Sequence, residues 1–137
     1  MTTTKKIMIV DDDEDDMEFF CEAVKEVDAS CACITATNGE EALQKLRKGK
    51  TKLPDLIFLD LNMPRMDGKT CLRELKKDRE LKNIPVIIST TSSHHKDMEE
   101  TLELGAVHFM TKSSTFDQIK TGIEKALQMV GSFEKSN

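Results

Sequence analysis

Short apolar runs recur along this chain, and each one ends in polar or charged residues. The run Leu56–Leu59 is the most uniform, because it lies between two aspartates and contains no polar residue. An apolar run without alternation is typical of a strand that is buried on both faces of a parallel sheet. Runs of this kind predict strands over 6–10, 32–36, 56–59, 85–90 and 106–111. The run at 32–36 is less apolar than the rest, which favours a position at the edge of the sheet.

Residues with helical periodicity follow each apolar run. Met17, Phe20 and Val24, for example, fall on one face of a helix whose first turn is acidic, as the helix dipole favours. Helices are predicted from Glu14 onward, between Asn38 and Gly49, over 68–78, around Met98 and Leu102 up to Gly105, and between Thr115 and Gly131. Residues 132–137 are expected to form a frayed tail.

Strand and helix therefore alternate five times, without an internal repeat or a linker. This alternation predicts an α/β fold: a doubly wound five-stranded parallel sheet in the order 2-1-3-4-5, flanked by five helices, as in flavodoxin-like folds. A chain of 137 residues with 38% hydrophobic residues can bury a core without disulfides or structural metals. We expect one domain over 1–137, with its core at about 6–130.

Composition excludes several classes of function. The net charge is −5, and acidic residues concentrate at 11–18, which argues against binding to nucleic acid. No apolar run approaches the roughly 20 residues that span a bilayer, and the N-terminal residues do not resemble a secretory signal. We therefore expect no membrane partner and a cytoplasmic location. The four cysteines, Cys21, Cys31, Cys33 and Cys71, form no metal-binding pair in sequence and are expected to be reduced.

Polar residues that could share one site follow four of the predicted strands. They are Asp11 and Asp12 after the first, Asp60 after the third, Thr90 at the end of the fourth and Lys112 after the fifth. In a sheet of this order the carboxyl ends of strands one and three are neighbours, at the edge where ligands bind. Three carboxylates that converge repel one another unless a cation compensates them. Oxygen ligands without imidazole or thiolate indicate Mg²⁺, with Mn²⁺ as a substitute.

A half-open magnesium site beside a carboxylate suits phosphoryl transfer. Asp60 could act as a nucleophile and accept a phosphoryl group, while Thr90 and Lys112 bind its oxygens. No side chain provides a strong general base for a turnover enzyme, so we expect a phosphoacceptor rather than an enzyme. Each of these residues could instead be only the solvated end of a strand, but five suitable residues at four strand ends favour a functional site.

The chain resembles the response regulator receiver domains of two-component signalling over almost its whole length. The residues that carry the resemblance are Val10-Asp11-Asp12, Leu59-Asp60-Leu-Asn-Met-Pro64, Asp67-Gly68, Thr90, Gly105-Ala106, Phe109 and Lys112. The resemblance implies that Asp60 is the phosphorylated residue. It also implies that Asp11, Asp12, Asp60 and the backbone carbonyl of Asn62 hold Mg²⁺, and that the phosphoryl donor is a sensor histidine kinase or a histidine phosphotransfer protein.

The same resemblance implies a conformational switch. Phe109 matches the switch aromatic of the family, which rotates inward as the hydroxyl of Thr90 moves toward the phosphoryl group on Asp60. The output surface is then expected on the fourth helix, the fifth strand and the fifth helix, where a new doubly charged group biases a two-state loop. The resemblance does not name the output protein.

The sequence departs from the family at Ser113, which follows Lys112 where the family usually has proline, often after a cis peptide bond. A cis bond before a residue other than proline costs about 2.5–4 kcal/mol, and the sequence does not decide between cis and trans for Lys112–Ser113. Asn62 and Ser92 occupy the two positions that tune hydrolysis in the family, and neither offers an acid or a base to guide water. We therefore expect a moderately persistent acyl phosphate.

Three other functions fit parts of the pattern. The chain could be an interaction module that works without phosphorylation, a small metal-dependent phosphatase with Asp60 as nucleophile, or a flavin-binding protein. A phosphatase would need a general acid two residues after Asp60, where Asn62 stands. Flavin binding would need a phosphate-cradling loop after the first strand, and none follows it. A stand-alone receiver therefore ranks first.

Overall fold

The computed structural model describes residues 5–48, 53–112 and 115–135, with side chains up to Val130. Within these ranges, every helix is too short or too polar to cross a membrane. The predictions about Gly49, about the Lys112–Ser113 bond and about residues 136–137 lie outside the described residues.

Five parallel strands form one sheet in the described part of the chain. They are β1 (Lys6–Val10), β2 (Ala32–Ala36), β3 (Leu56–Leu59), β4 (Val86–Thr90) and β5 (His108–Thr111). Their order is β2-β1-β3-β4-β5, which confirms the doubly wound topology and the edge position of β2. This order makes β1 and β3 neighbours, so that the chain segments following them start from the same edge of the sheet.

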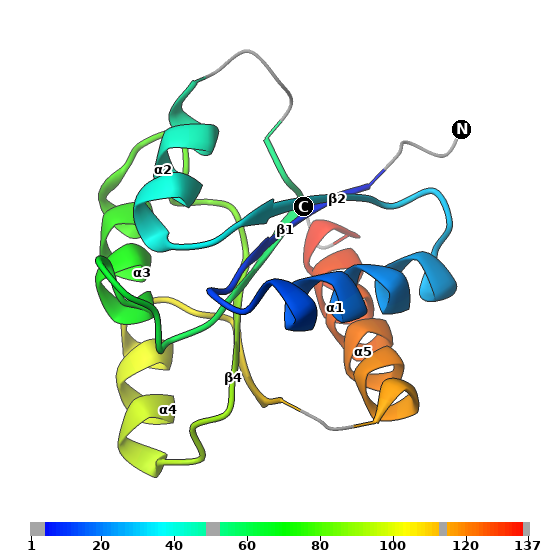
Figure 1. The fold of residues 1–137 in the computed structure, drawn as a ribbon. Helices are drawn as coiled ribbons and strands as arrows, with labels where there is room; N and C mark the ends of the chain where they lie inside the picture. Colours follow the sequence, from blue (N-terminus) through cyan, green and yellow to red (C-terminus); the bar gives the residue numbers. More distant parts are fainter. Residues whose placement is uncertain (1–4, 49–52, 113–114, 136–137) are drawn as a thin grey trace.

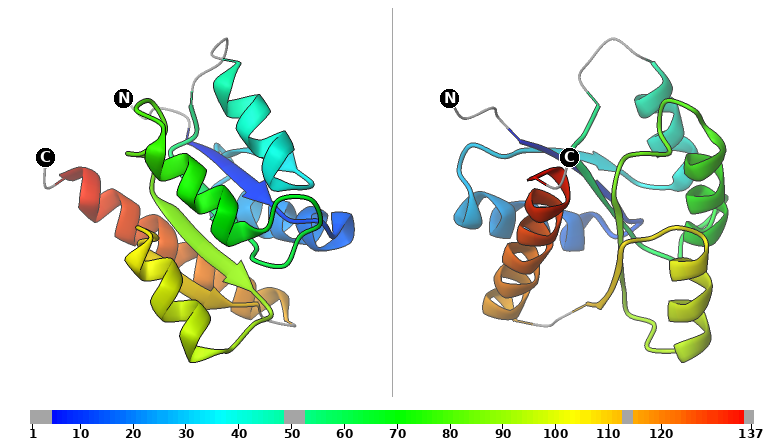
Figure 2. Two further views of the ribbon diagram at one scale, coloured as in Figure 1. Left: turned by 90° about the vertical axis from the view of Figure 1, so that its left-hand side faces the viewer. Right: turned by 180° about the vertical axis from the view of Figure 1, so that it is seen from behind.

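The helices form a layer on each side of the sheet (Figures 1 and 2). One face is covered by α1 (Glu14–Val27) and α5 (Phe116–Lys135), and the other by α2 (Gly39–Arg47), α3 (Gly68–Lys77) and α4 (His95–Glu103). The side chains of Asp13, Asn38 and Asp67 cap the first three helices, each accepting a hydrogen bond from the backbone N–H three residues later. These caps satisfy donors that the first turn leaves free.

Each face of the sheet has its own apolar core, because side chains alternate along a strand. Ile57 and Leu59 belong to the core under α2, α3 and α4. Leu56 and Phe58 belong to the core under α1 and α5. The same alternation carries Asp60, the next residue after β3, to the side of Phe58, toward α1 and α5.

The predicted end of the last helix was wrong, and one apolar residue on which the fourth helix was predicted is exposed. Helix α5 does not stop at Gly131 but continues to Lys135, so residues 132–135 are not a frayed tail. A glycine inside a helix costs only about 1 kcal/mol relative to alanine, and it ends a helix only where the chain turns into the left-handed region. In α4, Leu102 is 43% exposed and the buried residue is Thr101. Thr101 tolerates burial because its hydroxyl donates a hydrogen bond to the Asp97 carbonyl at 2.8 Å.

Candidate functional site

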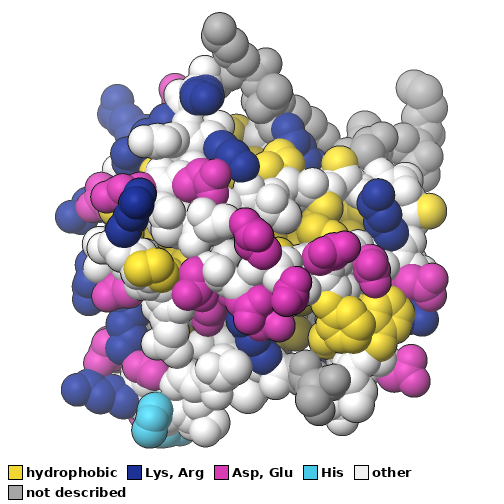
Figure 3. Space-filling view, in the orientation of Figure 1, with side chains coloured by type: hydrophobic (Ala, Val, Ile, Leu, Met, Phe, Trp, Pro, Cys, Tyr) yellow, Lys and Arg dark blue, Asp and Glu magenta, His cyan; other side chains and the backbone are white. Residues whose placement is uncertain are grey.

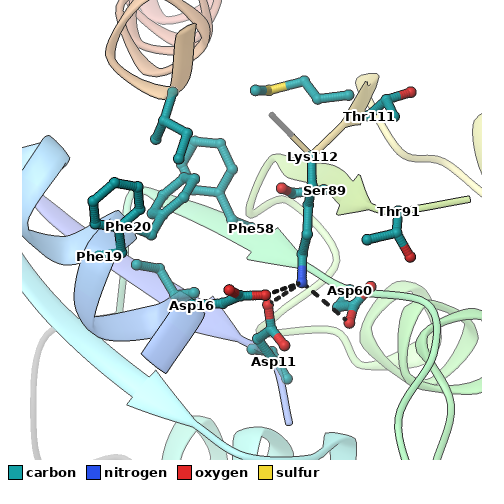
Figure 4. A pocket seen from close by; sticks show the side chains of 14 residues that line it. Asp11, Asp16, Phe19, Phe20, Phe58, Asp60, Ser89, Thr91, Thr111 and Lys112 are labelled. Atoms are coloured by element: carbon teal, nitrogen blue, oxygen red, sulfur yellow. Dashed lines mark hydrogen bonds and ion pairs between the residues drawn. The ribbon is translucent and has the colours of Figure 1, made fainter. Parts of the chain in front are cut away.

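A cavity of about 390 Å³ opens at the carboxyl ends of the strands, next to α1. Asp11, Asp60 and Lys112 line its polar end, and Phe20 and Phe58 line its apolar side (Figure 4). Figure 3 shows acidic side chains gathered on the surface where α1 begins. The cavity therefore joins the apolar gap between α1 and α5 to a strongly acidic rim.

Three carboxylates lie together where β1 and β3 end, and two of them, Asp11 and Asp60, line the cavity. Asp11 directly follows β1 and Asp60 directly follows β3, and the pairing of Val10 with Leu59 sets these two strand ends side by side. One side-chain oxygen from each of Asp11, Asp12 and Asp60 lies within 4.8 Å of the other two. Asp11 and Asp60 are buried, whereas Asp12 is exposed. The three carboxylates are thus close enough to share one cation.

Lys112 reaches this cluster from the end of β5 (Figure 4). Its ammonium lies 2.5 Å from an oxygen of Asp11, 3.3 Å from one of Asp16 and 3.6 Å from one of Asp60. The backbone N–H of Lys112 donates to the Thr90 carbonyl at 2.7 Å, which extends the pairing of β4 and β5 by one residue. This backbone bond aims the lysine side chain at the carboxylates.

Burial and charge act in opposite directions on this ion pair. Burial raises the pKa of Asp11 above its usual value, although hydrogen bonds from Lys112 and from the N–H of Asp13 favour the ionised form. Burial alone would lower the pKa of Lys112, but its hydrogen bond to Asp11 and the charges of Asp11 and Asp60 raise that pKa above its usual value. Lys112 is therefore held in its charged form by carboxylates that would otherwise repel one another.

The loop after Asp60 is folded tightly against that residue. The N–H of Leu61 donates to the Asp60 carboxylate at 2.8 Å, and the N–H of Gly68 donates to the Leu61 carbonyl at 2.9 Å. A Cβ atom at Gly68 would lie 2.2 Å from the Asp60 carbonyl oxygen, so only glycine fits there. Arg65 has a φ of 67°, in the left-handed region, which is strained for a residue other than glycine. Asn62 is exposed in the same loop.

Thr90 ends β4 and Ser92 follows it in the next loop, but neither residue lines the cavity. Thr90 is fully buried, and its hydroxyl accepts a hydrogen bond from the Ser92 N–H at 3.4 Å. The residues that line the cavity on this side are Ser89 and Thr91. The hydroxyl of Ser92 donates to Asp97 at 2.6 Å, which ties the loop after β4 to α4. Thr90 would have to move to contact a group bound to Asp60.

Phe109 lies on β5, opposite Ile88 of β4. It is partly buried and packs against the core under α2, α3 and α4. This places the ring on the opposite face of the sheet from the cavity, the face to which the buried Thr90 also belongs by the alternation of β4. Thr90 and Phe109 therefore lie on the same face of the sheet, on adjacent strands.

The family of the chain follows from comparison with known proteins. The model of the response regulator receiver domain matches residues 7–124. This chain belongs to the response regulator receiver family.

Relatives of this receiver include single-domain and longer proteins. Response regulator Rcp1 of Synechocystis sp. is 34% identical over 113 residues, which cover 80% of this receiver and 77% of Rcp1. The sensor histidine kinase CheAY of Helicobacter pylori is 30% identical over 125 residues, which cover 91% of this receiver but 15% of CheAY. The receiver thus spans only a small part of CheAY.

Solved receiver structures share the whole fold. The phosphorylated cyanobacterial phytochrome response regulator RcpA superimposes with a TM-score of 0.80 at 33% identity, covering 97% of this receiver and 93% of RcpA. The Mn²⁺-bound form of Rcp1 superimposes with a TM-score of 0.79 at 33% identity, covering 88% of this receiver and 91% of Rcp1. These likenesses confirm the predicted receiver fold.

The acidic end of the cavity suits a hard divalent cation. Its candidate ligands are carboxylate oxygens, the type that Mg²⁺ and Mn²⁺ prefer. Asp11, Asp12 and Asp60 carry three negative charges when ionised, and the ammonium of Lys112 offsets only one of them. The exposed Asp12 leaves one side open to solvent, as a cation that keeps several water ligands requires.

Asp16 is a residue of this receiver site that sequence reasoning did not select. It lies in the first turn of α1, and its carboxylate contacts Lys112 at 3.3 Å. Residues 11–16 are all acidic, and the sequence pattern alone does not tell which of them faces the lysine. Acidic residues in the first turn of a helix are ordinarily explained by compensation of the helix dipole. The contact of Asp16 with Lys112 was therefore not singled out from the sequence.

Proposed function

We propose that Asp60 accepts a phosphoryl group from the phosphohistidine of a sensor histidine kinase or a histidine phosphotransfer protein. A carboxylate oxygen of Asp60 would attack phosphorus, the P–N bond to the histidine would break, and the histidine nitrogen would keep the electron pair. One observation carries this proposal: Asp60 lies with two further carboxylates, Asp11 and Asp12, whose oxygens are within 4.8 Å, and with the ammonium of Lys112 at 3.6 Å.

The reaction is proposed to depend on Mg²⁺, with Mn²⁺ as a substitute. Asp11, Asp12, Asp60 and the backbone carbonyl of Asn62 would hold the ion. The mutual proximity of the three carboxylates supports this assignment, and the relative Rcp1 has been crystallised in a Mn²⁺-bound form. When bound, the cation would offset the charge of the carboxylates and of the phosphoryl oxygens.

Lys112 and Thr90 would bind the phosphoryl group after transfer. Lys112 would exchange Asp11 for a phosphoryl oxygen, which its position between Asp11 and Asp60 allows. Thr90 would give up the hydrogen bond from Ser92 and turn its hydroxyl toward Asp60. The space vacated by that movement would admit a further inward rotation of Phe109.

The output surface is proposed on α4, β5 and α5. β5 is an edge strand of the sheet, so one of its sides has no strand partner within the described sheet. Leu102 of α4 is a large apolar side chain left exposed on this side of the fold. A change at Thr90 and Phe109 would reach this surface directly, because both residues lie on the adjacent strands β4 and β5.

The lifetime of the acyl phosphate is proposed to be moderately long. Asn62 is exposed next to Asp60 but carries no group that takes a proton from water. The hydroxyl of Ser92 is engaged with Asp97 at 2.6 Å. Neither side chain would therefore guide water to the acyl phosphate.

We also propose that the chain acts as a single receiver domain in the cytoplasm. It would be modified once per signal and would not act as a turnover enzyme.

Phosphoramidate, which carries a P–N bond like phosphohistidine, tests this proposal. The wild type should gain one phosphoryl group by intact mass in MgCl₂ and little in excess EDTA, and Asp60→Asn should gain none. Labelling of Asp60→Asn equal to the wild type would exclude Asp60 as the acceptor. A wild type that stays unmodified would favour an interaction module that works without phosphorylation.

A further inference from the structure

Two cysteines that are distant in sequence meet at the junction of α1 and β2. Cys21 lies in the second half of α1, and Cys33 lies on the edge strand β2. The Sγ atoms are 2.6 Å apart, and both residues are partly buried. Neither is bonded covalently in the structure. The contact is unrelated to the carboxylate site.

The fold holds this pair in place from both sides. Cys33 is fixed on the sheet by its pairing with Ile7 of β1. Cys21 packs with Cys33 against the core under α1 and α5. A disulfide has an S–S length of about 2.03–2.05 Å, so the sulfur atoms need to approach by only about 0.6 Å.

We propose that Cys21 and Cys33 are a redox modification site, which hydrogen peroxide or a similar hydroperoxide closes into an intramolecular disulfide. The modification would join α1 to the edge strand of the sheet. The proximity of the two thiols makes this modification possible, and it does not depend on phosphorylation of Asp60.

The two thiols are not equivalent. The hydrogen bond between the two thiols lowers the pKa of Cys21, an effect that burial opposes and the nearby charge of Lys25 reinforces. The same hydrogen bond, together with burial, raises the pKa of Cys33. Cys21 is thus the thiol that ionises first and reacts with the oxidant, and Cys33 is the thiol that resolves the product.

The reaction balances with one peroxide per disulfide. The Cys21 thiolate attacks one peroxide oxygen, the O–O bond breaks, and the products are a sulfenic acid and hydroxide, which takes up the proton that Cys21 released. The sulfur of Cys33 then attacks the sulfur of Cys21, the S–O bond breaks, and the hydroxyl group leaves as water with the Cys33 proton. Two thiols lose two electrons, and peroxide is reduced to two water molecules.

The other two cysteines provide matched controls. Cys31 is 3% exposed, and burial raises its pKa. Cys71 is fully buried in the opposite core, and burial raises its pKa to about 12. Both are expected to remain thiols under conditions that oxidise Cys21, because the thiolate is the reactive form and peroxide has little access to them.

Peptide mapping of the oxidised wild type tests the proposal. Reduced full-length protein is treated with hydrogen peroxide and digested without reductant. We expect a linked pair of peptides that contain Cys21 and Cys33, an intact mass lower by two hydrogen atoms, and reversal by dithiothreitol. Cys31→Ala and Cys71→Ala should form the same link, and Cys21→Ser and Cys33→Ser should not.

The result from the wild type decides the question even if a variant folds poorly. A link that includes Cys31 or Cys71, a link between two chains, oxygen added to Cys21 without a link, or unreacted Cys21 and Cys33 would each overturn the proposal.

Discussion

The ammonium of Lys112 lies 2.5 Å from Asp11 but 3.6 Å from Asp60. The lysine is therefore held mainly by a carboxylate that is not the proposed phosphoacceptor. To bind a phosphoryl group on Asp60 it must loosen its contact with Asp11 and also with Asp16, which lies 3.3 Å away on α1. The carboxylates that surround Lys112 thus compete with the incoming group.

Removal of Asp16 should ease this exchange. The Asp16 side chain is 51% exposed, and an exposed ion pair contributes at most about 1 kcal/mol. Asp16→Asn is therefore expected to speed phosphorylation by acetyl phosphate by about two- to fivefold. The rate is measured by intact mass against time. Asp15→Asn, which removes an exposed charge from the same turn, should have a smaller effect, and equal acceleration by both would show that only net charge matters.

Mg²⁺ should stabilise the fold through the three clustered carboxylates. A ligand at about 100 times its Kd adds roughly 2.7 kcal/mol to the free energy of unfolding. Because the chain has no tryptophan or tyrosine, this is best followed by circular dichroism during urea unfolding, with and without MgCl₂. Asp12→Asn should lose most of the stabilisation, and Asp15→Asn should keep it. Retention of the full Mg²⁺ effect in Asp12→Asn would place the ion elsewhere.

The stability that the loop after β4 gives to the fold should depend on pH through the ionisation of Asp97. Hydrogen bonds from Lys69 and Ser92 lower the pKa of this carboxyl below its ordinary value of 3.8. A group with a lowered pKa stabilises the fold above its ordinary pKa, and this contribution disappears as the pH falls through the lowered value. Asp97→Asn should therefore destabilise the protein at neutral pH by less than about 1 kcal/mol, given its partial exposure.

The difference in unfolding free energy between the wild type and Asp97→Asn should shrink as the pH falls below 3.8. Urea unfolding across this range provides the measurement. A difference that stays constant with pH would mean that the charge of Asp97 does not hold the loop.

Gly68 should be intolerant of any side chain. A Cβ at this position would lie 2.2 Å from the Asp60 carbonyl oxygen and 2.6 Å from the Leu61 Cα, both backbone atoms. Gly68→Ala is expected to destabilise the protein by about 1–3 kcal/mol or more, by overpacking, and to slow phosphorylation because it shifts the Asp60 backbone.

Gly122→Ala is the matched control for this substitution. Its Cβ would meet only the flexible end of Met110 at 2.5 Å, while alanine favours the helix by about 1 kcal/mol. The free energies of unfolding of both variants are compared by urea titration. Equal effects of the two substitutions would refute the close-approach argument.

The sequence predicted the sheet and the site because both depend on strand ends. Every residue of the run Leu56–Leu59 is apolar, so both faces of β3 had to be buried and the strand had to be central in the sheet. Asp60, the first polar residue after the run, had to lie at the end of the strand. Asp11 and Lys112 followed in the same way from the ends of β1 and β5. Their convergence with Asp60 is seen in the structure, while their roles in phosphoryl transfer stay predictions.

The features that the sequence did not reveal depend on side-chain direction. Leu102 fits a helical apolar face, but the packing of α4 buries Thr101 instead, since a backbone carbonyl satisfies its hydroxyl. The contact of Asp16 with Lys112 depends on side-chain rotamers that no periodicity encodes. The contact of Cys21 with Cys33 depends on how α1 crosses β2.

Intact mass after incubation with acetyl phosphate and Mg²⁺ tests the central claim most directly, in the wild type and in Asp60→Asn. The account predicts one added phosphoryl group in the wild type, its loss when EDTA replaces Mg²⁺, and an unchanged mass for Asp60→Asn. A phosphoryl group on Asp60→Asn, or wild-type labelling that does not depend on a divalent cation, would contradict it.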